Sequence, residues 1–434
     1  MDSIIPESIN PVVHALIAEK ARPYVAGGAV RDKLLGRSIV DVDFEVYDLS
    51  VRRLVEILSR FGHVETVGKS FGVIKLWGHG IAPLDFALPR RESKVGRGHR
   101  GFVVACDAEL TMEEACARRD FTINAMLLEP LSGEIFDFFG GQKDLVDRVL
   151  RHTSERFVED PLRPLRAMQF AGRFDMKLHP DTAQLCRTML SEAITLPEER
   201  IYGEWEKWAI ESVRRAAGLR VLWDSGWLSL FPRLAKIAQY DVQDAKWEDG
   251  LWGQTVRAVD RVAELALHEK LGPKDTSTLV FSALCLSMVD ADAFLKRIGA
   301  PGFLRRNVPL LVDEKELVTG KVAFFNQTDI RRLAQRLQPV TIYLLGLLME
   351  AWGAEPGLRR WEELRKRAAD LGIERTPPER LVMGRDLIAL GISPGPQMGE
   401  LLQQAFEAQL AGEFETREDA MVWAKNKWNT RVQK

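Results

Sequence analysis

The hydrophobic pattern changes its period near residue 140, and this change constrains the fold more than any other feature of the sequence. From about residue 23 to 140, β-type runs such as YVAGGAV, VDVDFEVY and GVIKLWG alternate with helical stretches such as LSVRRLVEILSRFG. Beyond about residue 144, amphipathic stretches such as GEWEKWAIESVRRAAG take over. Because apolar residues recur with different periods in strands and helices, we expect an α+β chain: an α/β head with a mixed sheet, followed by an all-helical remainder.

The length of the chain predicts several domains. A chain of 434 residues is too long for a single hydrophobic core. Glycine, proline and aspartate, which favour turns, cluster after residue 140 at GQKDLVD, SGWLSLFPRL and GAEPG. These breaks predict a catalytic head over residues 1–140, a helical neck over 141–235, a helical body over 236–355 and a helical tail over 356–434.

Charge, apolar runs and cysteines narrow the class of protein. The formal net charge is −2, so nucleic-acid binding would need a local basic face. The first residues carry no export-signal pattern and no run is apolar enough to span a bilayer, so we expect a cytoplasmic protein without a membrane partner. The four cysteines are far apart and form no CxxC pair, which favours buried free thiols over a zinc cluster or disulfides.

A glycine pair lies between a predicted strand and a predicted helix. In Gly27-Gly28-Ala29-Val30-Arg31-Asp32, the glycines would let backbone N–H groups approach a phosphate closely. The helix N-terminus and Arg31 would favour negative charge there. Such a turn is more often only a turn, so its meaning depends on the motif that follows.

That motif is a D-x-D sequence in a β-type run. Side chains alternate along a strand, so Asp41 and Asp43 are expected on one face, roughly 7 Å apart. Two such carboxylates can hold one or two Mg²⁺ ions, which assist phosphoryl transfer by activating the attacking hydroxyl and neutralising the departing pyrophosphate. Alone, the motif could equally be a solvated strand edge, but its position shortly after the glycine turn favours catalysis.

A third carboxylate, Asp85, lies in the apolar-flanked segment PLDFAL. On a neighbouring strand it could accept the proton of the attacking hydroxyl. The alternative is an exposed strand residue or an ion-pair partner for Arg90.

Two arginines precede another predicted strand in the segment RRDFTINA. The planar guanidinium groups of Arg118 and Arg119 suit triphosphate oxygens, and Asp120 could orient an arginine or bind a ribose hydroxyl. A structural salt-bridge cluster is the alternative interpretation.

The segment EDPLRPLR begins a helical region. Asp160 is a candidate N-cap with Pro161 at the first helical position, and the spacing predicts that Asp160, Arg163 and Arg166 share one helix face. A carboxylate acceptor beside guanidinium donors could hydrogen-bond the edge of a nucleotide base. Capping plus an ion pair is the alternative.

In this order, GGAVRD, DVDF, RRDFTINAM, EDPLRPLRA and the later ERIYGE resemble the motifs of class II tRNA nucleotidyltransferases, which are the CCA-adding enzymes and their poly(A) polymerase relatives. The resemblance implies tRNA as partner, ATP and CTP as substrates and two Mg²⁺ ions. It also implies three roles: metal ligation by Asp41 and Asp43, phosphate and sugar binding by Gly28, Arg31 and Arg119, and base contacts by Asp160, Arg163 and Arg166.

Two further stretches, ALPRRESKVGRGHRGFVV and LVDRVLRHTSERFVEDPLR, resemble the bacterial branch that usually carries a C-terminal HD phosphohydrolase domain. An HD site needs several histidines, yet His268 is the sole histidine after His179. We therefore expect a helical remnant without phosphatase activity. Pro164 and Gln169 also depart from the family pattern in the base-reading segment.

CCA addition is the expected activity, because the stretch from Pro89 to Leu110 is long, glycine-containing and basic. In the family, a loop here is associated with the switch from CTP to ATP. An enzyme that adds only A or only CC, a poly(A) polymerase and an inactive RNA-binding protein are the alternatives. Arginine pairs in the helical part, such as Arg305-Arg306 and Arg331-Arg332, could contact phosphates or simply form solvated faces.

Overall fold

The computed structural model describes residues 7–39, 41–67, 73–78, 84–94, 102–106, 110–240, 246–247, 250–319, 326–353 and 360–432. These residues form two compact units, Met1–Pro232 and Arg233–Lys434. The boundary between the units falls within the predicted break at SGWLSLFPRL. The finer division into four domains stays a prediction.

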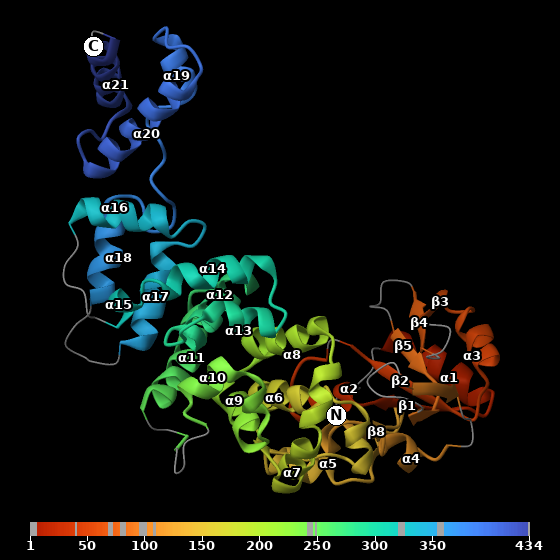
Figure 1. Ribbon diagram of the computed structural model, residues 1–434. Coiled ribbons are helices and arrows are strands. Elements are labelled where there is room, and N and C mark those ends of the chain that lie inside the picture. Colours follow the sequence, from red (N-terminus) through yellow and green to blue (C-terminus); the bar gives the residue numbers. More distant parts are fainter. Residues whose placement is uncertain are drawn as a thin grey trace. The chain divides into compact units, whose positions relative to one another are not determined.

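The first unit is built on a mixed sheet of seven strands (Figure 1). Strands β2 and β5 run parallel, and the other neighbouring pairs are antiparallel. In spatial order the strands are β3 (His63–Val67), β4 (Val73–Trp77), β5 (Leu84–Ala87), β2 (Asp43–Tyr47), β1 (Arg22–Ala26), β8 (Met126–Leu128) and β9 (Ile135–Asp137).

The two central strands are buried on both faces, which explains their continuous apolar runs. All residues of β1 and β2 except the first of each are buried. On one face Phe44 stacks on Phe86, with ring centroids 4.9 Å apart. Another cluster packs Tyr24 and Tyr47 against Leu127. The centre of the sheet is therefore held rigidly between apolar layers, and this fixes where its strands end.

Helices, 3₁₀ turns and two short strand pairs complete the first unit. The strand pairs are β6 (Arg90–Lys94) with β7 (Phe102–Cys106), antiparallel, and β10 (Val149–Leu150) with β11 (Lys177–Leu178), parallel. The helical elements are η1 (Glu7–Ile9), α1 (Asn10–Ala18), α2 (Gly28–Leu34), α3 (Val51–Leu58), α4 (Met112–Cys116), η2 (Thr122–Asn124), α5 (Gly141–Val146), η3 (Glu155–Glu159), α6 (Arg163–Phe174), α7 (Pro180–Thr188), η4 (Leu190–Thr195), α8 (Glu198–Glu211), α9 (Arg215–Asp224) and η5 (Trp227–Leu230).

Helix α6 is central to the helical part of this unit and packs against α8 and α9. The approach to α9 is close enough to require glycine: a Cβ at Gly218 would lie 2.6 Å from the carbonyl oxygen of Met168. Helix α6 begins at Arg163, so the prediction that Asp160 is its N-cap is wrong. Asp160 is extended, as expected for a residue before proline, and its Oδ1 accepts a hydrogen bond from the backbone N–H of Leu162.

The later start of α6 explains how Pro164 is tolerated. This proline occupies the first turn of the helix, where its missing N–H has no intrahelical acceptor to lose. The departure from the family pattern noted in the sequence therefore does not interrupt the helix.

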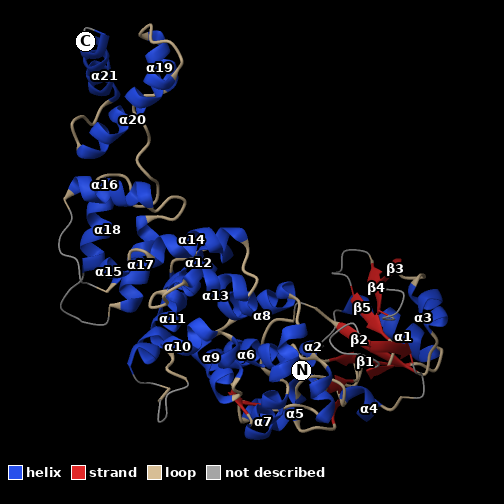
Figure 2. Ribbon diagram, in the orientation of Figure 1, coloured by secondary structure: helices blue, strands red, loops and turns tan. Residues whose placement is uncertain are grey.

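In the second unit, every regular element that the structure describes is a helix (Figure 2). The helices are α10 (Pro232–Ile237), whose first residue closes the first unit, α11 (Gly250–His268), α12 (Pro273–Cys285), α13 (Ala291–Arg297), α14 (Gly302–Val312), α15 (Lys315–Val318), α16 (Gln327–Arg336), α17 (Ile342–Trp352), α18 (Arg360–Asp370), α19 (Gly384–Ala389), α20 (Pro396–Ala411) and α21 (Arg417–Val432). Helices α11, α12 and α17 pack together, while α19 to α21 enclose an apolar cluster that includes Leu387, Leu401 and Ala424. None of the described helices combines the length and the apolar character needed to cross a membrane.

Candidate active site

Carboxylates meet at the point where β2 begins. Asp43 is the first residue of β2 and lies directly beside Asp85 of the parallel strand β5. Solvent reaches the side chain of Asp43, but the protein atoms around it partly desolvate the carboxyl. This partial burial raises the pKa of Asp43, and the charges of Asp85 and Asp41 raise it further. We call Asp41, Asp43 and Asp85 the carboxylate cluster.

Asp41 is exposed and precedes β2, so the prediction that both aspartates lie within the strand is wrong for Asp41. The antiparallel partner strand β1 ends at Ala26, and Gly27 then turns away with a φ of 69°. Because β1 has no residue left to pair with Asp41, the ladder stops at Asp43. The charge of Asp41 still contributes to raising the pKa of Asp43.

Asp85 is held by a lysine of the next strand. Lys75 of β4 lies beside it in register, and the Lys75 Nζ is 2.9 Å from a carboxylate oxygen of Asp85. The structure therefore supplies an ion-pair partner other than Arg90, whose side chain lies outside the described residues. The ion pair fixes the direction of Asp85 beside Asp43.

Two members of the carboxylate cluster fit a divalent cation chemically. Asp41 and Asp43 offer exposed oxygen ligands of the type that Mg²⁺ prefers, and a cation would relieve the repulsion that raises the pKa of Asp43. Within the part of the chain that the structure describes, no three Asp, Glu, His or Cys side chains are grouped closely enough to hold a metal. The pair therefore fits an ion that takes its other ligands from substrate and water.

The glycine pair of the GGAVRD motif makes room for an arginine. A Cβ at Gly27 would lie only 2.6 Å from Nη1 of Arg119, and the positive φ of Gly27 also favours glycine. Gly28 begins helix α2 directly after this turn. The first motif and an arginine of the RRDFTINA segment are thus brought together.

Arg119 forms an ion pair with a buried residue for which the sequence predicted no role. Its Nη2 donates to Oε2 of Glu45 at 2.7 Å, and the hydroxyl of Tyr47 donates to Oε1 of the same carboxylate at 3.0 Å. Burial alone would lower the pKa of Arg119, but the Glu45 carboxylate raises it above its ordinary value. Strand alternation, which places Glu45 on the same face as Asp43, was the signal in the sequence that could have identified it.

Arg31 is buried and bonded to protein groups. It forms an ion pair with Asp32 at 2.9 Å, donates to Oδ1 of Asn124 at 2.6 Å and lies over the ring of Phe174, with its guanidinium carbon 4.4 Å from the ring centroid. Burial lowers the pKa of Arg31. In this arrangement its guanidinium joins the glycine turn to α6, and it is not open to solvent as a phosphate-binding group would be.

Asp120 joins the head to α6. Its carboxylate accepts hydrogen bonds from Asn124 Nδ2 at 3.0 Å and from Arg166 Nε at 2.8 Å. Burial would raise the pKa of Asp120, but the charge of Arg166 and the bond from Asn124 lower it. Arg166 also approaches the buried Glu204 of α8 at 3.9 Å. The structure thus brings together the third, fourth and fifth motifs of the resemblance.

Arg163 and Asp160 have structural partners of their own. Arg163 donates to the backbone carbonyl oxygens of Arg156 at 2.7 Å and Arg118 at 2.6 Å. Asp160 accepts from Arg200 Nη2 at 3.0 Å in addition to its bond from Leu162. Both side chains thus have structural contacts, with partners other than those of the capping and ion-pair alternative, and each side chain remains partly exposed.

Other sequence expectations concern regions away from these residues. The three described cysteines, Cys116, Cys186 and Cys285, are free and buried. The stretch from Pro89 to Leu110 contains the β6–β7 pair, but the side chains of this pair and residues 95–101 lie outside the described residues. His268 is exposed beside Glu269. The absence of HD phosphohydrolase activity stays a prediction.

The sequence is similar to known proteins over part of its length. Residues 23–151 match the family model of the poly A polymerase head domain. The multifunctional CCA protein of Xanthomonas campestris pv. campestris (strain B100) is 42% identical over 217 residues, which cover 49% of this chain and 51% of that protein. A protein of the same name from Nitrosococcus oceani is 42% identical over 194 residues, covering 44% of this chain and 46% of its own. The matched region thus spans about half the length of these curated relatives.

The whole chain is similar in fold to solved structures. The Bacillus stearothermophilus CCA-adding enzyme in complex with CTP matches with a TM-score of 0.69 and 24% identity, over 99% of this chain and 100% of that chain. The Thermotoga maritima CCA-adding enzyme complexed with tRNA matches with a TM-score of 0.66 and 20% identity, over 98% and 97% of the two chains. The predicted α+β fold and the resemblance stated from the motifs are confirmed.

Proposed function

We propose that the chain is a CCA-adding tRNA nucleotidyltransferase, which attaches C, C and A from CTP and ATP to the 3′ end of tRNA without a nucleic-acid template. The observation that carries the proposal is the carboxylate cluster, in which Asp43 and Asp85 lie in register beside a glycine turn and Arg119. The names of the relatives and the CTP and tRNA complexes of the structural neighbours support the choice of substrates. A tRNA substrate is also consistent with a cytoplasmic location.

The reaction that we propose is attack of the tRNA 3′ hydroxyl on the α-phosphorus of the bound nucleotide, with pyrophosphate as the leaving group. Asp41 and Asp43 would hold Mg²⁺, which, when bound, lowers the pKa of the hydroxyl and neutralises charge on the departing pyrophosphate. Asp85, oriented by Lys75, is the carboxylate beside Asp43 that would accept the proton.

Nucleotide binding is assigned to residues around the glycine turn and the start of α6. Gly27 and Gly28 would allow close approach of the triphosphate, and Arg118 and Arg119 would supply positive charge, with Arg119 lying against Gly27. Arg31, Asp32 and Asp120 belong to the buried contacts that orient these groups. Asp160, Arg163 and Arg166 would present an acceptor and donors to the base, and the partial exposure of these side chains supports that role.

Incubation of the protein with tRNA transcripts that lack A, CA or CCA, each with a single labelled nucleotide and Mg²⁺, tests the proposal. CTP is expected to extend the transcript lacking CCA by two residues, and ATP to extend the transcripts ending in CC by one. Addition of C alone or A alone would replace the proposal with a CC-adding or A-adding enzyme. Long A tails would indicate a poly(A) polymerase, and no incorporation with intact tRNA binding would indicate an inactive RNA-binding protein.

A further inference from the structure

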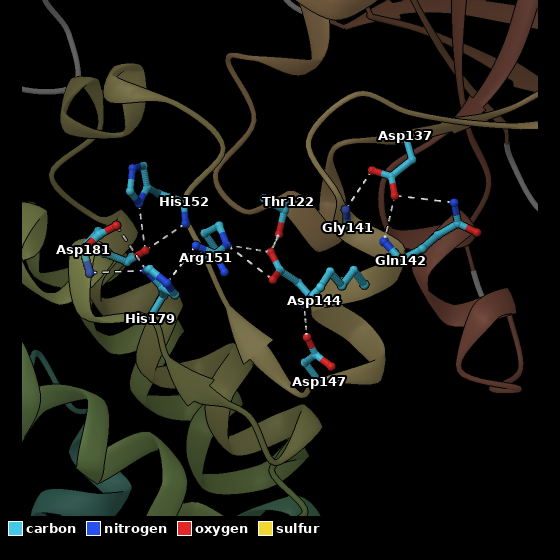
Figure 3. Close-up of polar contacts among 12 residues, drawn as sticks. Thr122, Asp137, Gly141, Gln142, Asp144, Asp147, Arg151, His152, His179 and Asp181 are labelled. Carbon is cyan, nitrogen blue, oxygen red and sulfur yellow. Dashed lines mark hydrogen bonds and ion pairs between the residues drawn. The ribbon is translucent and has the colours of Figure 1, made fainter.

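A partly buried polar cluster lies behind the nucleotide-binding residues and shares none of the contacts assigned to nucleotide. It consists of Thr122 of η2, Asp144 of α5, Arg151 after β10 and His179 before α7. Figure 3 shows these side chains pointing toward one another from elements that are far apart in the sequence. We call them the support cluster.

Asp144 is the centre of the support cluster. Its side chain is almost completely buried, and its Oδ2 accepts hydrogen bonds from Thr122 Oγ1 at 2.7 Å and from Arg151 Nε at 3.1 Å. Desolvating a carboxylate costs free energy that one ion pair seldom more than offsets, so stability alone explains such a residue poorly. A buried charge that accepts two directed bonds does, however, specify one geometry for its partners.

Arg151 extends this geometry to the neighbouring elements. Its Nη1 donates to His179 Nε2 at 2.7 Å, and its backbone carbonyl accepts the N–H of Thr122 at 3.0 Å. The other ring nitrogen of His179, Nδ1, lies 3.3 Å from the backbone nitrogen of Asp181, at the start of α7. Thr122 is therefore bound through both its backbone and its side chain to one rigid group.

The group that is held in this way carries the nucleotide-site contacts. Turn η2 comprises Thr122 to Asn124, and Asn124 binds both Asp120 and Arg31. Helix α5 is pressed against the same turn, because a Cβ at Gly141 would lie 2.3 Å from the carbonyl oxygen of Thr122. Any change in the position of Thr122 is thus passed directly to Asn124, two residues later.

We infer that Thr122, Asp144 and Arg151 are positioning residues for nucleotide binding: they fix η2 so that Asn124 can hold Asp120 and Arg31 in place. The support cluster acts through η2 and touches no reacting atom. This inference rests on the proposed function, since it names how the same site is oriented.

Thr122→Val tests the inference most directly, because it removes the hydroxyl that binds Asp144 at nearly constant volume. We expect the KM for CTP and ATP to rise about tenfold, the effect of losing one buried hydrogen-bonding partner, while the KM for tRNA stays unchanged. Thr122→Ser keeps the hydroxyl and is expected to keep the wild-type KM. Asp144→Asn, which keeps the shape but removes the charge, is expected to raise the nucleotide KM in the same direction.

Asp147→Asn is the matched control, because Asp147 follows the same helix and forms only an exposed pair with Lys143. It is expected to leave every kinetic constant unchanged. A lower melting temperature for Thr122→Val with unchanged nucleotide KM values, measured well below the melting point, would overturn the inference and indicate a purely structural cluster. Failure of the wild-type protein to incorporate any nucleotide would instead overturn the proposed function, so the two failures are distinguishable.

Discussion

Two groups of charged residues in the first unit differ in the charges that surround their carboxylates. In the carboxylate cluster, partial burial raises the pKa of Asp43, and the like charges of Asp85 and Asp41 raise it further. In the contacts around Asp120, each charge has a partner of opposite sign, and the pKa of Asp120 is lowered. The first arrangement is the one to which we assign a bound cation, whereas in the second the charges are paired within the protein.

We interpret this difference as a division between residues that bind metal and nucleotide and residues that maintain the structure of the site. A site that binds a metal and a polyphosphate must keep uncompensated charge at some cost to folding. The scaffold that orients it must satisfy its own charges, because an unpaired buried charge is costly. The predictions below test this division, from the largest expected effect to the smallest.

The largest effect is expected in the carboxylate cluster. Asp43→Ala or Asp41→Ala should lower nucleotide incorporation about a thousandfold, because each removes a proposed metal ligand, while leaving the melting temperature and tRNA binding nearly unchanged. Incorporation of labelled CTP in saturating Mg²⁺ is the measurement. Asp48→Asn, in the exposed pair with Arg22 just after the same strand, should behave as wild type. Retention of more than about a tenth of the activity by Asp43→Ala would break the assignment.

The second effect concerns stability of the paired residues. Glu45→Ala leaves the guanidinium of Arg119 without its carboxylate partner and should lower the free energy of unfolding by about 3 kcal/mol, measured by urea denaturation. Glu56→Ala removes a carboxylate from an exposed ion pair with Arg53 and should change stability little. Equal free energies of unfolding for the two variants would mean that the buried Glu45–Arg119 pair contributes no more to stability than the exposed Glu56–Arg53 pair.

Asp160 lies between the two categories, because it is paired with Arg200 and yet partly exposed. If it reads the base, Asp160→Ala should reduce discrimination against UTP and GTP by about 1 to 3 kcal/mol in kcat/KM. If it only holds Arg200 and Leu162, the melting temperature should fall and the nucleotide preference should stay the same. Measuring kcat/KM for all four nucleotides beside a melting curve decides between these roles. Full selectivity in Asp160→Asn would remove Asp160 from the base-reading set.

The smallest expected effect is on the free energy of unfolding. Its change at neutral pH should have opposite signs for substitutions of Asp43 and Asp120. Because the pKa of Asp43 is raised in the folded state, its ionised form opposes folding at neutral pH, and this penalty disappears as the pH falls through its folded pKa. Asp43→Asn should therefore stabilise the metal-free protein at pH 7, by about 1 kcal/mol or less after solvent screening, and this gain should shrink on acidification.

The pKa of Asp120 is lowered, so its stabilising contribution is present above its unfolded pKa and is lost as the pH falls through its folded pKa. Asp120→Asn should accordingly destabilise the protein at pH 7, and the difference from wild type should vanish in acid. Unfolding curves of both variants from pH 7 to 3 provide the measurement. The same sign for both variants would contradict the division between the two groups.

The sequence by itself determined the class of fold and supplied the candidates for the chemistry. The change of hydrophobic period is a local property, so it correctly separated the sheet-containing part from the helical part. The glycine pair, Asp41 and Asp43 could also be recognised, because spacing along a strand and beside a turn is set by the nearest residues. These features depend on short-range geometry that the order of residues contains.

Only the tertiary structure decided which charges are paired. Glu45 and Arg119 are separated by more than half of the head in sequence, and only the sheet brings them within 2.7 Å. Arg31 has the positive charge of a phosphate-binding residue, but the packing of α2 against Phe174 of α6 buries its side chain. Asp160 likewise has its ion-pair partner, Arg200, 40 residues later in the sequence. The charged residues can be read directly from a sequence. The burial of each one and its partner depend on where the packed core places the side chain. The sequence could therefore name the charged residues, but it could not separate those that bind ligands from those that are structural.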